Sequence, residues 1–275
     1  MACDSRETIE HVRDFTIDIY KELLAELIAF RFSFKTYTEF VRMNAHEKKL
    51  LLLRHDVDAR KKNSLLFATI QHSFGVKGTY YFRNIPASYD ETLIREVASM
   101  SHEIGYHYET MDTQKGDVDK AYDEFCRTLE KFRKIAPVTT ICMHGSPLSP
   151  YDNRSIWDKY DYKTLGLLAE PYFDLDFNKV FYLTDTGRRW DGASVSVRDK
   201  AMTGKESTNR AFTERHFRST TDIISSLKAG DFPNTVMMTF HPQRWSNGYL
   251  PWTQELFLQG LKNSVKKVLI SRRAA

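Results

Sequence analysis

The stretch Leu50-Leu51-Leu52-Leu53-Arg54-His55-Asp56-Val57-Asp58 decides the fold. Its four leucines form an apolar run without alternation, which is typical of a strand buried on both faces of a parallel sheet. Asp56 and Asp58 are spaced i, i+2, so an extended backbone points both carboxylates to the same side. Catalytic groups of α/β enzymes lie at this end of buried parallel strands. The alternative is an Asp-rich turn that caps the next helix, and the stretch alone leaves both open.

Helical and strand patterns alternate on the carboxyl side of this run. The spacing of apolar residues predicts strands at 49–55, 78–83, 104–107, 139–143 and 235–240, and helices at 60–72, 90–100, 118–132 and 220–229. Alternating β and α units indicate a parallel sheet with right-handed crossovers, either open or closed into a barrel.

The chain shows no internal repeat, low-complexity tract or Gly/Ser/Pro linker, so residues 1–275 are predicted to form a single domain. Within it, residues 1–47 are expected to be an added N-terminal helical segment, with helices over 6–30 and 35–46. Residues 48–245 are expected to form the barrel and its loops. Residues 246–275 are expected to form a C-terminal helix.

Composition restricts the classes of function. The 40 basic and 36 acidic residues give a net charge of +4 without a block of one sign, so nucleic-acid binding is not indicated. No apolar stretch is long enough to span a bilayer, and the N-terminus lacks the apolar core of a signal peptide. Cys3, Cys126 and Cys142 show no CxxC spacing, which favours reduced thiols in the cytoplasm. Nothing indicates an oligomeric state.

Five of the nine histidines follow or end a predicted strand: His55, His102, His107, His144 and His241. Because parallel strands share one carboxyl edge, such residues are expected to converge there with the aspartates. Imidazoles and carboxylates together suit zinc or a similar divalent metal with open positions. An ion of this kind activates water for attack on an amide or ester carbonyl, given a base and an acid. The alternative is that these histidines are hydrogen-bonded helix caps.

The order of motifs resembles the polysaccharide deacetylase superfamily, the NodB-homology enzymes of carbohydrate esterase family 4. The resemblance covers about residues 48–245 and rests on Arg54-His55-Asp56-Val57-Asp58, Gly78-Thr79-Tyr80-Tyr81-Phe82, His102-Glu103-Ile104-Gly105-Tyr106-His107 and His241-Pro242. The variants HDVD, HEIGYHYE, MHGSP, TDTGRRW and HPQRW are similar to a WbmS-like branch found with bacterial surface-polysaccharide gene clusters. The resemblance implies a deformed (β/α) barrel of about seven parallel strands.

The resemblance also implies roles for single residues. Asp56 would be the catalytic base, and His241 would be the acid that protonates the leaving amine. Asp58 and His107 would be metal ligands. The family's second ligand histidine lies four residues after the first, where this chain has Met111. Glu109 or His144 could complete the site, and His144 is preferred; otherwise the metal is bound loosely or not at all.

A second departure concerns the family's Arg-Pro-Pro motif, whose arginine orients the catalytic Asp. Met143-His144-Gly145-Ser146-Pro147 stands there instead, so Arg54 or His144 would have to take over that role.

Arginines and tryptophans predict the walls of a substrate site. They lie at Arg188-Arg189-Trp190, close after Asp185, and at Arg244-Trp245. Indole faces stack on sugar rings, and arginine binds carboxylate or phosphate groups through its paired nitrogens. Arg54 and Glu109 complete the expected substrate-binding set. The alternative is that both tryptophans are core residues and the arginines make surface ion pairs.

The sequence therefore predicts a cytoplasmic, metal-dependent hydrolase that removes an N-acyl group, with N-acetyl expected, from a sugar of bacterial surface-polysaccharide biosynthesis. The expected cofactor is a divalent metal ion, with zinc as its identity. Two alternatives stay open. One is a C–N hydrolase acting on a non-sugar amide, and the other is a non-catalytic sugar-binding relative that has lost its metal.

Overall fold

The structure is a computed structural model that describes residues 13–43, 47–146, 149–190 and 216–260. Its elements in chain order are α1 (Ile17–Ala29), β1 (Ser33–Lys35), α2 (Tyr37–Arg42), β2 (Leu50–Val57), α3 (Lys61–Ser73), β3 (Thr79–Phe82), α4 (Glu91–Ser99), β4 (Glu103–Tyr108), α5 (Thr110–Thr113), α6 (Val118–Arg133), β5 (Ile141–Met143), η1 (Asn153–Asp158), η2 (Tyr162–Leu165), α7 (Pro171–Asp174), β6 (Phe181–Thr184), α10 (Thr220–Ala229), β7 (Thr235–Phe240) and η4 (Pro242–Arg244). Residues 249–260 are also helical.

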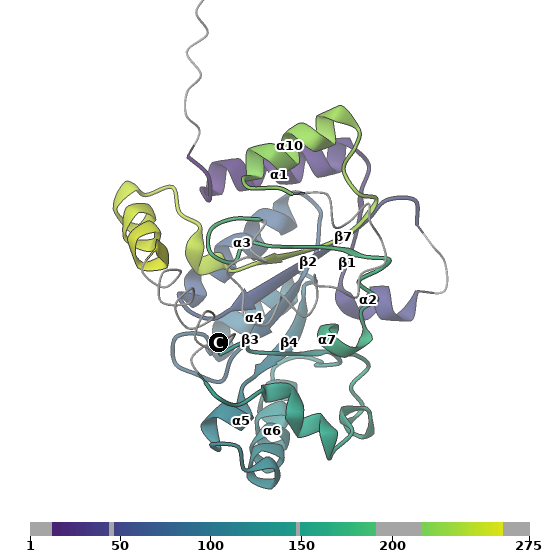
Figure 1. Cartoon of the computed structure of the whole chain (residues 1–275), viewed down its shortest axis with the longest axis vertical. Helices are drawn as coiled ribbons and strands as arrows, with labels where there is room; N and C mark the ends of the chain where they lie inside the picture. The colour runs from purple at the N-terminus through teal and green to yellow at the C-terminus, as the bar shows by residue number, and fades with distance from the viewer. Residues whose placement is uncertain (1–12, 44–46, 147–148, 191–215, 261–275) are drawn as a thin grey trace, which may run out of the picture.

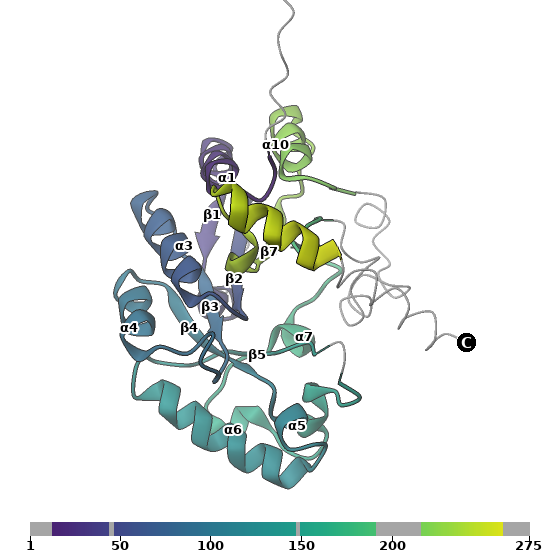
Figure 2. The same ribbon diagram turned by 90° about the vertical axis from the view of Figure 1, so that its left-hand side faces the viewer.

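The described strands form one curled, seven-stranded sheet (Figures 1 and 2). Its order is β5-β4-β3-β2-β7-β6, with β1 paired to the first half of β2, and every pairing is parallel. The central strand β2 pairs with β7 from Leu50 to His55 and with β3 from Arg54 to Val57. This topology confirms the predicted deformed (β/α) barrel of about seven parallel strands.

Side-chain alternation gives the sheet an apolar outer face. Leu51, Leu53 and Val57 of β2 belong to the main hydrophobic core, together with Val236 and Met238 of β7. Helices cover this face: α1 lies beside α10, and α3, α4 and α6 follow along the curve of the sheet (Figures 1 and 2). Because outer positions recur every second residue, the residues between them must point inward.

The inner face changes from apolar to polar along the strands. At the amino end, Leu52 and Met237 pack with Tyr37, Ala169 and Leu175 in a second, smaller cluster that fills the barrel. Farther along β2, the inward positions are Arg54 and Asp56. The apolar cluster therefore closes one end of the barrel and leaves the functional groups at the carboxyl end.

Most predicted elements occur within one or two residues of their expected bounds. The described part of the first helix begins at Ile17 rather than at residue 6, because residues 13–16 are not helical and Thr16 caps α1. Two short strands, β1 and β6, were not predicted.

The C-terminal helix is described over 249–260, and residues 261–275 lie outside the described ranges, as does Cys3. Within those ranges, no helix is long and apolar enough to cross a membrane.

Candidate active site

Four strands bring polar side chains to the carboxyl end of the sheet. Asp56 lies one residue before the end of β2, Asp58 directly follows that strand, and His107 lies near the end of β4. His144 follows β5 and His241 follows β7. These five residues, predicted from the sequence as base, acid and metal ligands, converge within the ion-pair distances given below. The structure therefore brings these five side chains together, and the His241 side chain makes no cap hydrogen bond at η4.

Arg54 holds the carboxylate of Asp56 from the same strand. Its Nε and Nη2 donate to Oδ1 and Oδ2 at 2.8 and 2.7 Å. The rings of Tyr81 and Tyr172 lie 5.8 and 5.4 Å from the guanidinium carbon. Burial raises the pKa of Asp56, but the charge and hydrogen bonds of Arg54, together with His107 and His241, lower it overall. Asp56 is therefore an ionised carboxylate with a fixed orientation, and Arg54 is 2% exposed and occupied by this pairing.

A glycine permits this packing around Arg54. A Cβ atom at position 105 would come within 2.3 Å of the Tyr81 ring, so β4 approaches that ring closely only because it has Gly105 there. The Gly in the His-Glu-Ile-Gly sequence thus has a steric role beneath the site.

Two imidazoles face one oxygen of Asp58. The Nε2 atoms of His107 and His144 lie 3.6 and 3.5 Å from Asp58 Oδ1. That oxygen is buried and has no hydrogen-bond partner among the described residues. Burial raises the pKa of Asp58, but the imidazoles of His144, His241 and His107 lower it overall. The result is an ionised oxygen whose local partners are two ring nitrogens.

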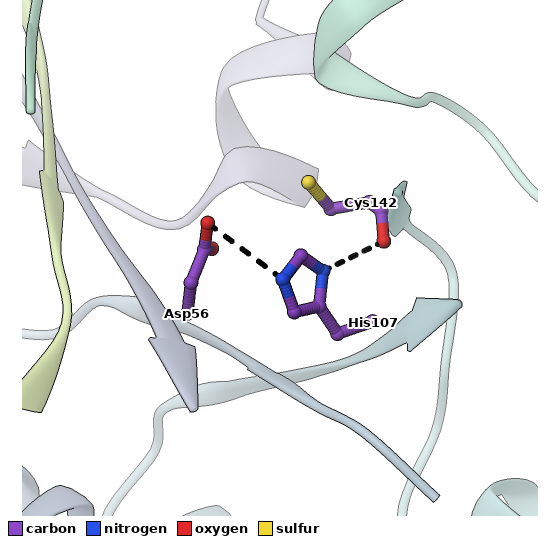
Figure 3. Close-up of side chains that lie close together, drawn as sticks. All are labelled: Asp56, His107 and Cys142. Atoms are coloured by element: carbon purple, nitrogen blue, oxygen red, sulfur yellow. Dashed lines mark hydrogen bonds and ion pairs between the residues drawn. The ribbon is translucent and has the colours of Figure 1, made fainter. Parts of the chain in front are cut away.

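In His107 and His144, the contacts made by Nδ1 decide whether Nε2 has a free lone pair for a metal ion. His107 Nδ1 lies 2.9 Å from the carbonyl oxygen of Cys142 (Figure 3), and a carbonyl only accepts, so Nδ1 carries the proton. Burial lowers the pKa of His107 to about 4, so the ring is neutral at pH 7 with its Nε2 lone pair free. His144 Nδ1 lies 3.1 Å from Glu109 Oε2 and 3.1 Å from Ser146 Oγ. Both rings therefore direct Nε2 toward Asp58.

These residues fit a divalent metal. Two ligands of a tetrahedral zinc ion, each about 2.0–2.2 Å from it, lie roughly 3.3–3.6 Å apart. The distances from Asp58 Oδ1 to the two Nε2 atoms, 3.5 and 3.6 Å, agree with this spacing. Carboxylate and backbone acceptors behind ligand histidines are the usual outer shell of zinc sites. Asp58, His107 and His144 could hold the ion.

Two groups other than this one bring three potential ligand atoms within 4.8 Å of one another, a mutual spacing that Asp58, His107 and His144 do not reach. One is Asp56, His107 and Cys142 (Figure 3), and the other is Glu109, Asp112 and His144. Their carboxylates already have strong donors: Arg54 binds Asp56, Arg83 binds Glu109, and Ser149 and Asn153 bind Asp112. Asp58 is the carboxylate with an unused buried oxygen, so we prefer the set that contains it.

Asp185 and His241 form a second charged unit on the opposite side of Asp58. His241 Nδ1 lies 2.5 Å from Asp185 Oδ1, so its Nε2 faces the site, 3.9 Å from Asp58 Oδ2. Asp185 also accepts from Arg244 Nη1 and Trp245 Nε1, each at 2.8 Å. Burial raises the pKa of Asp185, but His241 and Arg244 lower it overall. A carboxylate held in this way fixes the orientation of the His241 ring.

Glu109, a further acidic residue near the metal ligands, accepts hydrogen bonds at both of its oxygens. Arg83 Nε and Nη2 donate to Oε1 and Oε2 at 3.0 and 2.5 Å, and His144 lies against Oε2. Burial raises the pKa of Glu109, but hydrogen bonds from His144 and Arg83 lower it overall to about 2. Glu109 is thus an ionised link between Arg83 and His144.

Two motif histidines lie on the outer face and support the fold. His55 Nδ1 lies 3.1 Å from the carbonyl oxygen of Thr79, and its ring stacks on Tyr80. His102 Nδ1 accepts from the backbone N–H of Gly78, and its Nε2 lies 3.0 Å from the carbonyl oxygen of Ala68. Both rings are buried, so neither contributes to the site.

The expected substrate walls are not where the sequence placed them. Trp190 and Trp245 are 2% and 1% exposed and pack with Phe15 and Phe240, so neither indole offers a face to a sugar. The alternative, that the tryptophans are core residues, fits the structure.

The arginines and Asp185 need the same correction. Arg188 is buried, lies 4.8 Å from the Trp252 ring centroid, and donates to the carbonyl oxygen of Arg244. Arg244 and Asp185 bind each other, and Arg54 binds Asp56, so these three support catalytic groups rather than line an open wall. Arg189 is exposed.

Sequence reasoning missed Arg83 and Gln243. Arg83 follows the aromatic strand β3 on an inward position, and this position was the available signal. Gln243 Nε2 donates to Asp58 Oδ2 at 3.4 Å from the 3₁₀ turn after His241, and no sequence pattern marks it.

Comparison with solved structures gives matches to carbohydrate esterases. A family 4 carbohydrate esterase domain of a multidomain xylanase from the hindgut metagenome of Trinervitermes trinervoides is 13% identical over 79% of this chain and 85% of that chain, with a TM-score of 0.42. The catalytic domain of peptidoglycan N-acetylglucosamine deacetylase from Eubacterium rectale is 13% identical over 80% and 87%, with a TM-score of 0.43. A family 4 carbohydrate esterase from Streptomyces lividans in complex with acetate is 15% identical over 77% and 87%, with a TM-score of 0.39.

No protein-family model matches the chain, and no curated protein matches it. Membership of the polysaccharide deacetylase superfamily and of its WbmS-like branch therefore stays a prediction from the sequence motifs.

Proposed function

We propose that this protein is a metal-dependent hydrolase that removes an N-acyl group, with N-acetyl expected, from a sugar of bacterial surface-polysaccharide biosynthesis. One observation carries the proposal. Asp58 Oδ1, which has no hydrogen-bond partner among the described residues, faces the Nε2 atoms of His107 and His144. The Asp56 carboxylate lies near His107, and the His241 imidazole, bound by Asp185, lies near the other oxygen of Asp58.

The residues divide the proton transfers of amide hydrolysis between them. Asp56, held in one orientation by Arg54, accepts a proton from the attacking water. His241 delivers a proton from Nε2 to the leaving amine, and Asp185 stabilises the imidazolium before that step. A non-catalytic sugar-binding protein would have no use for such an acid and base on opposite sides of one centre.

The metal ligands in this proposal are Asp58, His107 and His144. A divalent ion held there, with zinc as the proposed identity, would polarise the carbonyl and lower the pKa of water. The three residues supply one negative charge and two neutral nitrogens, a donor set that suits zinc.

The substrate class and the location rest on the sequence. The motif variants support a surface-polysaccharide sugar or its precursor. The scattered cysteines support a cytoplasmic location, and Cys126 and Cys142 form no disulfide in the part of the chain that the structure describes.

The first experiment is elemental mass spectrometry on protein purified without chelator, with Asp58→Ala and His107→Ala alongside. Near-stoichiometric zinc in the wild type, lost from both variants, is the expected result. A panel of N-acetylated sugars, free and nucleotide-linked, then tests hydrolysis by acetate release. Wild-type protein that binds none of the divalent ions zinc, cobalt, nickel and iron would contradict the proposal.

The catalytic assignment has its own test. Asp56→Asn and His241→Ala should each lower the hydrolysis rate by about 10²–10⁴-fold, while zinc binding persists. The matched control is Asp90→Asn, a partly exposed helix cap outside the group of site residues. Full activity in either catalytic variant would refute its assignment.

A further inference from the structure

His144 needs a partner that fixes its ring, because an imidazole can present either nitrogen to a metal. In this structure Nδ1 faces Glu109 Oε2 at 3.1 Å, and Nε2 faces Asp58 Oδ1 at 3.5 Å. Both neighbours are carboxylates and can only accept, so the neutral ring can donate to one of them only, and a metal bound at Nε2 requires the proton on Nδ1. Ser146 Oγ, also 3.1 Å from Nδ1, can donate or accept and does not decide the question.

Glu109 is the better-fixed carboxylate. Arg83 binds both of its oxygens through the paired nitrogens of the guanidinium, at 3.0 and 2.5 Å, which fixes the plane of the carboxylate. Asp58 instead leaves Oδ1 without a hydrogen-bond partner among the described residues. The proton of His144 therefore belongs on Nδ1, facing Glu109, and the lone pair belongs on Nε2, facing Asp58.

Arg83 also connects the two strands that carry the site. It follows β3 directly, between β2 and β4 in the sheet. Besides binding Glu109 after β4, its Nη1 lies 3.5 Å from the backbone oxygen of Asp58 after β2. Arg83 thus contacts both the proposed metal ligand Asp58 and Glu109, the carboxylate beside the proposed ligand His144.

We propose that Arg83 and Glu109 are positioning residues that make His144 the third metal ligand by fixing its tautomer and ring orientation. This inference rests on the proposed function, since it needs a metal held by Asp58, His107 and His144. It assigns Glu109 to the support of a ligand rather than to substrate contact. It also explains how the site is completed although Met111 occupies the position of the family's second histidine.

The expected effect is on metal affinity. Removing an outer-shell partner of a ligand histidine lowers affinity by about 10–100-fold. Zinc dissociation constants, measured by competition with a chromophoric chelator, should rise by this factor in Glu109→Ala and in Arg83→Ala. His144→Ala should show a larger rise. Arg95→Ala is the matched control, because Arg95 binds Glu91 in a surface ion pair, and its affinity should equal that of the wild type.

A second readout does not need the metal. In metal-free protein, long-range ¹H–¹⁵N correlation spectra of the histidine rings distinguish the Nδ1–H from the Nε2–H tautomer. At a pH where the ring is neutral, His144 should be protonated on Nδ1 in the wild type and should lose that preference in Glu109→Ala. A role of Glu109 in folding alone would leave the tautomer of a folded variant unchanged.

The two proposals fail in different ways. If the wild type binds zinc and His144→Ala weakens it, but Glu109→Ala and Arg83→Ala retain wild-type affinity, the positioning role is overturned and the proposed function stands. If the wild type binds no divalent ion, both are overturned. If a single variant fails to fold, the double variant Arg83→Met with Glu109→Leu replaces it, because neither member of that ion pair then keeps a charge. The positioning role requires the double variant to show the same loss of zinc affinity.

Discussion

Arg54 and Asp56 lie two residues apart on one strand and are joined by two hydrogen bonds of 2.8 and 2.7 Å. Both point into the barrel because side chains of a strand alternate between its faces. The proposed catalytic base therefore has its counter-charge on the same strand. Because both residues belong to β2, no loop motion can separate them.

We predict that Arg54→Met destabilises the protein by about 3–5 kcal/mol, because it leaves the buried Asp56 carboxylate without a counter-charge. Urea unfolding measures this change. The double variant Arg54→Met with Asp56→Asn should recover most of the loss, since neither charge remains, but it should stay inactive. A single variant as stable as the wild type would show that the pair does not compensate Asp56.

Asp185→Asn should reduce hydrolysis of an N-acetyl sugar far more than hydrolysis of an aryl acetate. Asp185 supports the protonated form of His241, which protonates an amine leaving group, whereas a phenolate leaves without that proton. The amide rate is expected to fall by about 10²–10⁴-fold. His241→Ala should show the same selectivity between the substrates. If Asp185→Asn lowered the hydrolysis rates of the amide and the aryl ester equally, Asp185 would have no role in protonating the leaving group.

Chelation should lower the thermal stability of the wild type. The proposed ligands Asp58, His107 and His144 belong to the ends of β2, β4 and β5, so a bound ion ties three strands together. Zinc at 100 times its dissociation constant contributes about 2.7 kcal/mol. Differential scanning calorimetry with and without a chelator checks this. Asp58→Ala should unfold at one temperature under both conditions, and a shift in that variant would point to another zinc site.

Burial raises the pKa of Glu170 to about 7. Because this value lies above the ordinary 4.5, the protonated carboxyl favours the folded state. This contribution, on the order of 3 kcal/mol, is complete below pH 4.5 and is lost as the pH rises through 7.

The free energy of unfolding, measured in urea between pH 4.5 and 8, should accordingly contain a falling component in the wild type. This fall in the free energy of unfolding with rising pH should be absent from Glu170→Gln. It should be present in the control Glu91→Gln, which alters an exposed carboxyl. An identical slope in Glu170→Gln and the wild type would exclude Glu170 as its source.

The sequence was sufficient for the strands that carry the site. Leu50 to Leu53 and residues 235–240 are apolar enough to require burial, and the polar residues after them must then share one edge of the sheet. That rule predicts that Asp56, Asp58, His107, His144 and His241 converge, but it also selects His55 and His102, and the roles of base, acid and ligand come from the family resemblance. The three residues of β1 and the four of β6 are too short to give a pattern.

The roles of the supporting residues depend on which strands are neighbours. Asp185 meets His241 because β6 pairs with β7, a pairing that the 50 residues between these strands do not indicate. Similarly, Trp190 and Trp245 pack against Phe15, which precedes the first helix. An Arg-Trp pair in a polar turn looks the same in a sequence whether the indole faces a sugar or the core.

Met111 is 4% exposed and belongs to the main hydrophobic core. Met111→His would thus bury an imidazole among apolar side chains. A histidine at 111 therefore carries a cost in core packing that a histidine at 144, in the partly exposed loop after β5, does not carry. Chains with an apolar residue at 111 and a histidine at 144 are expected to form a lineage of their own, in which Arg83 and Glu109 change together or not at all.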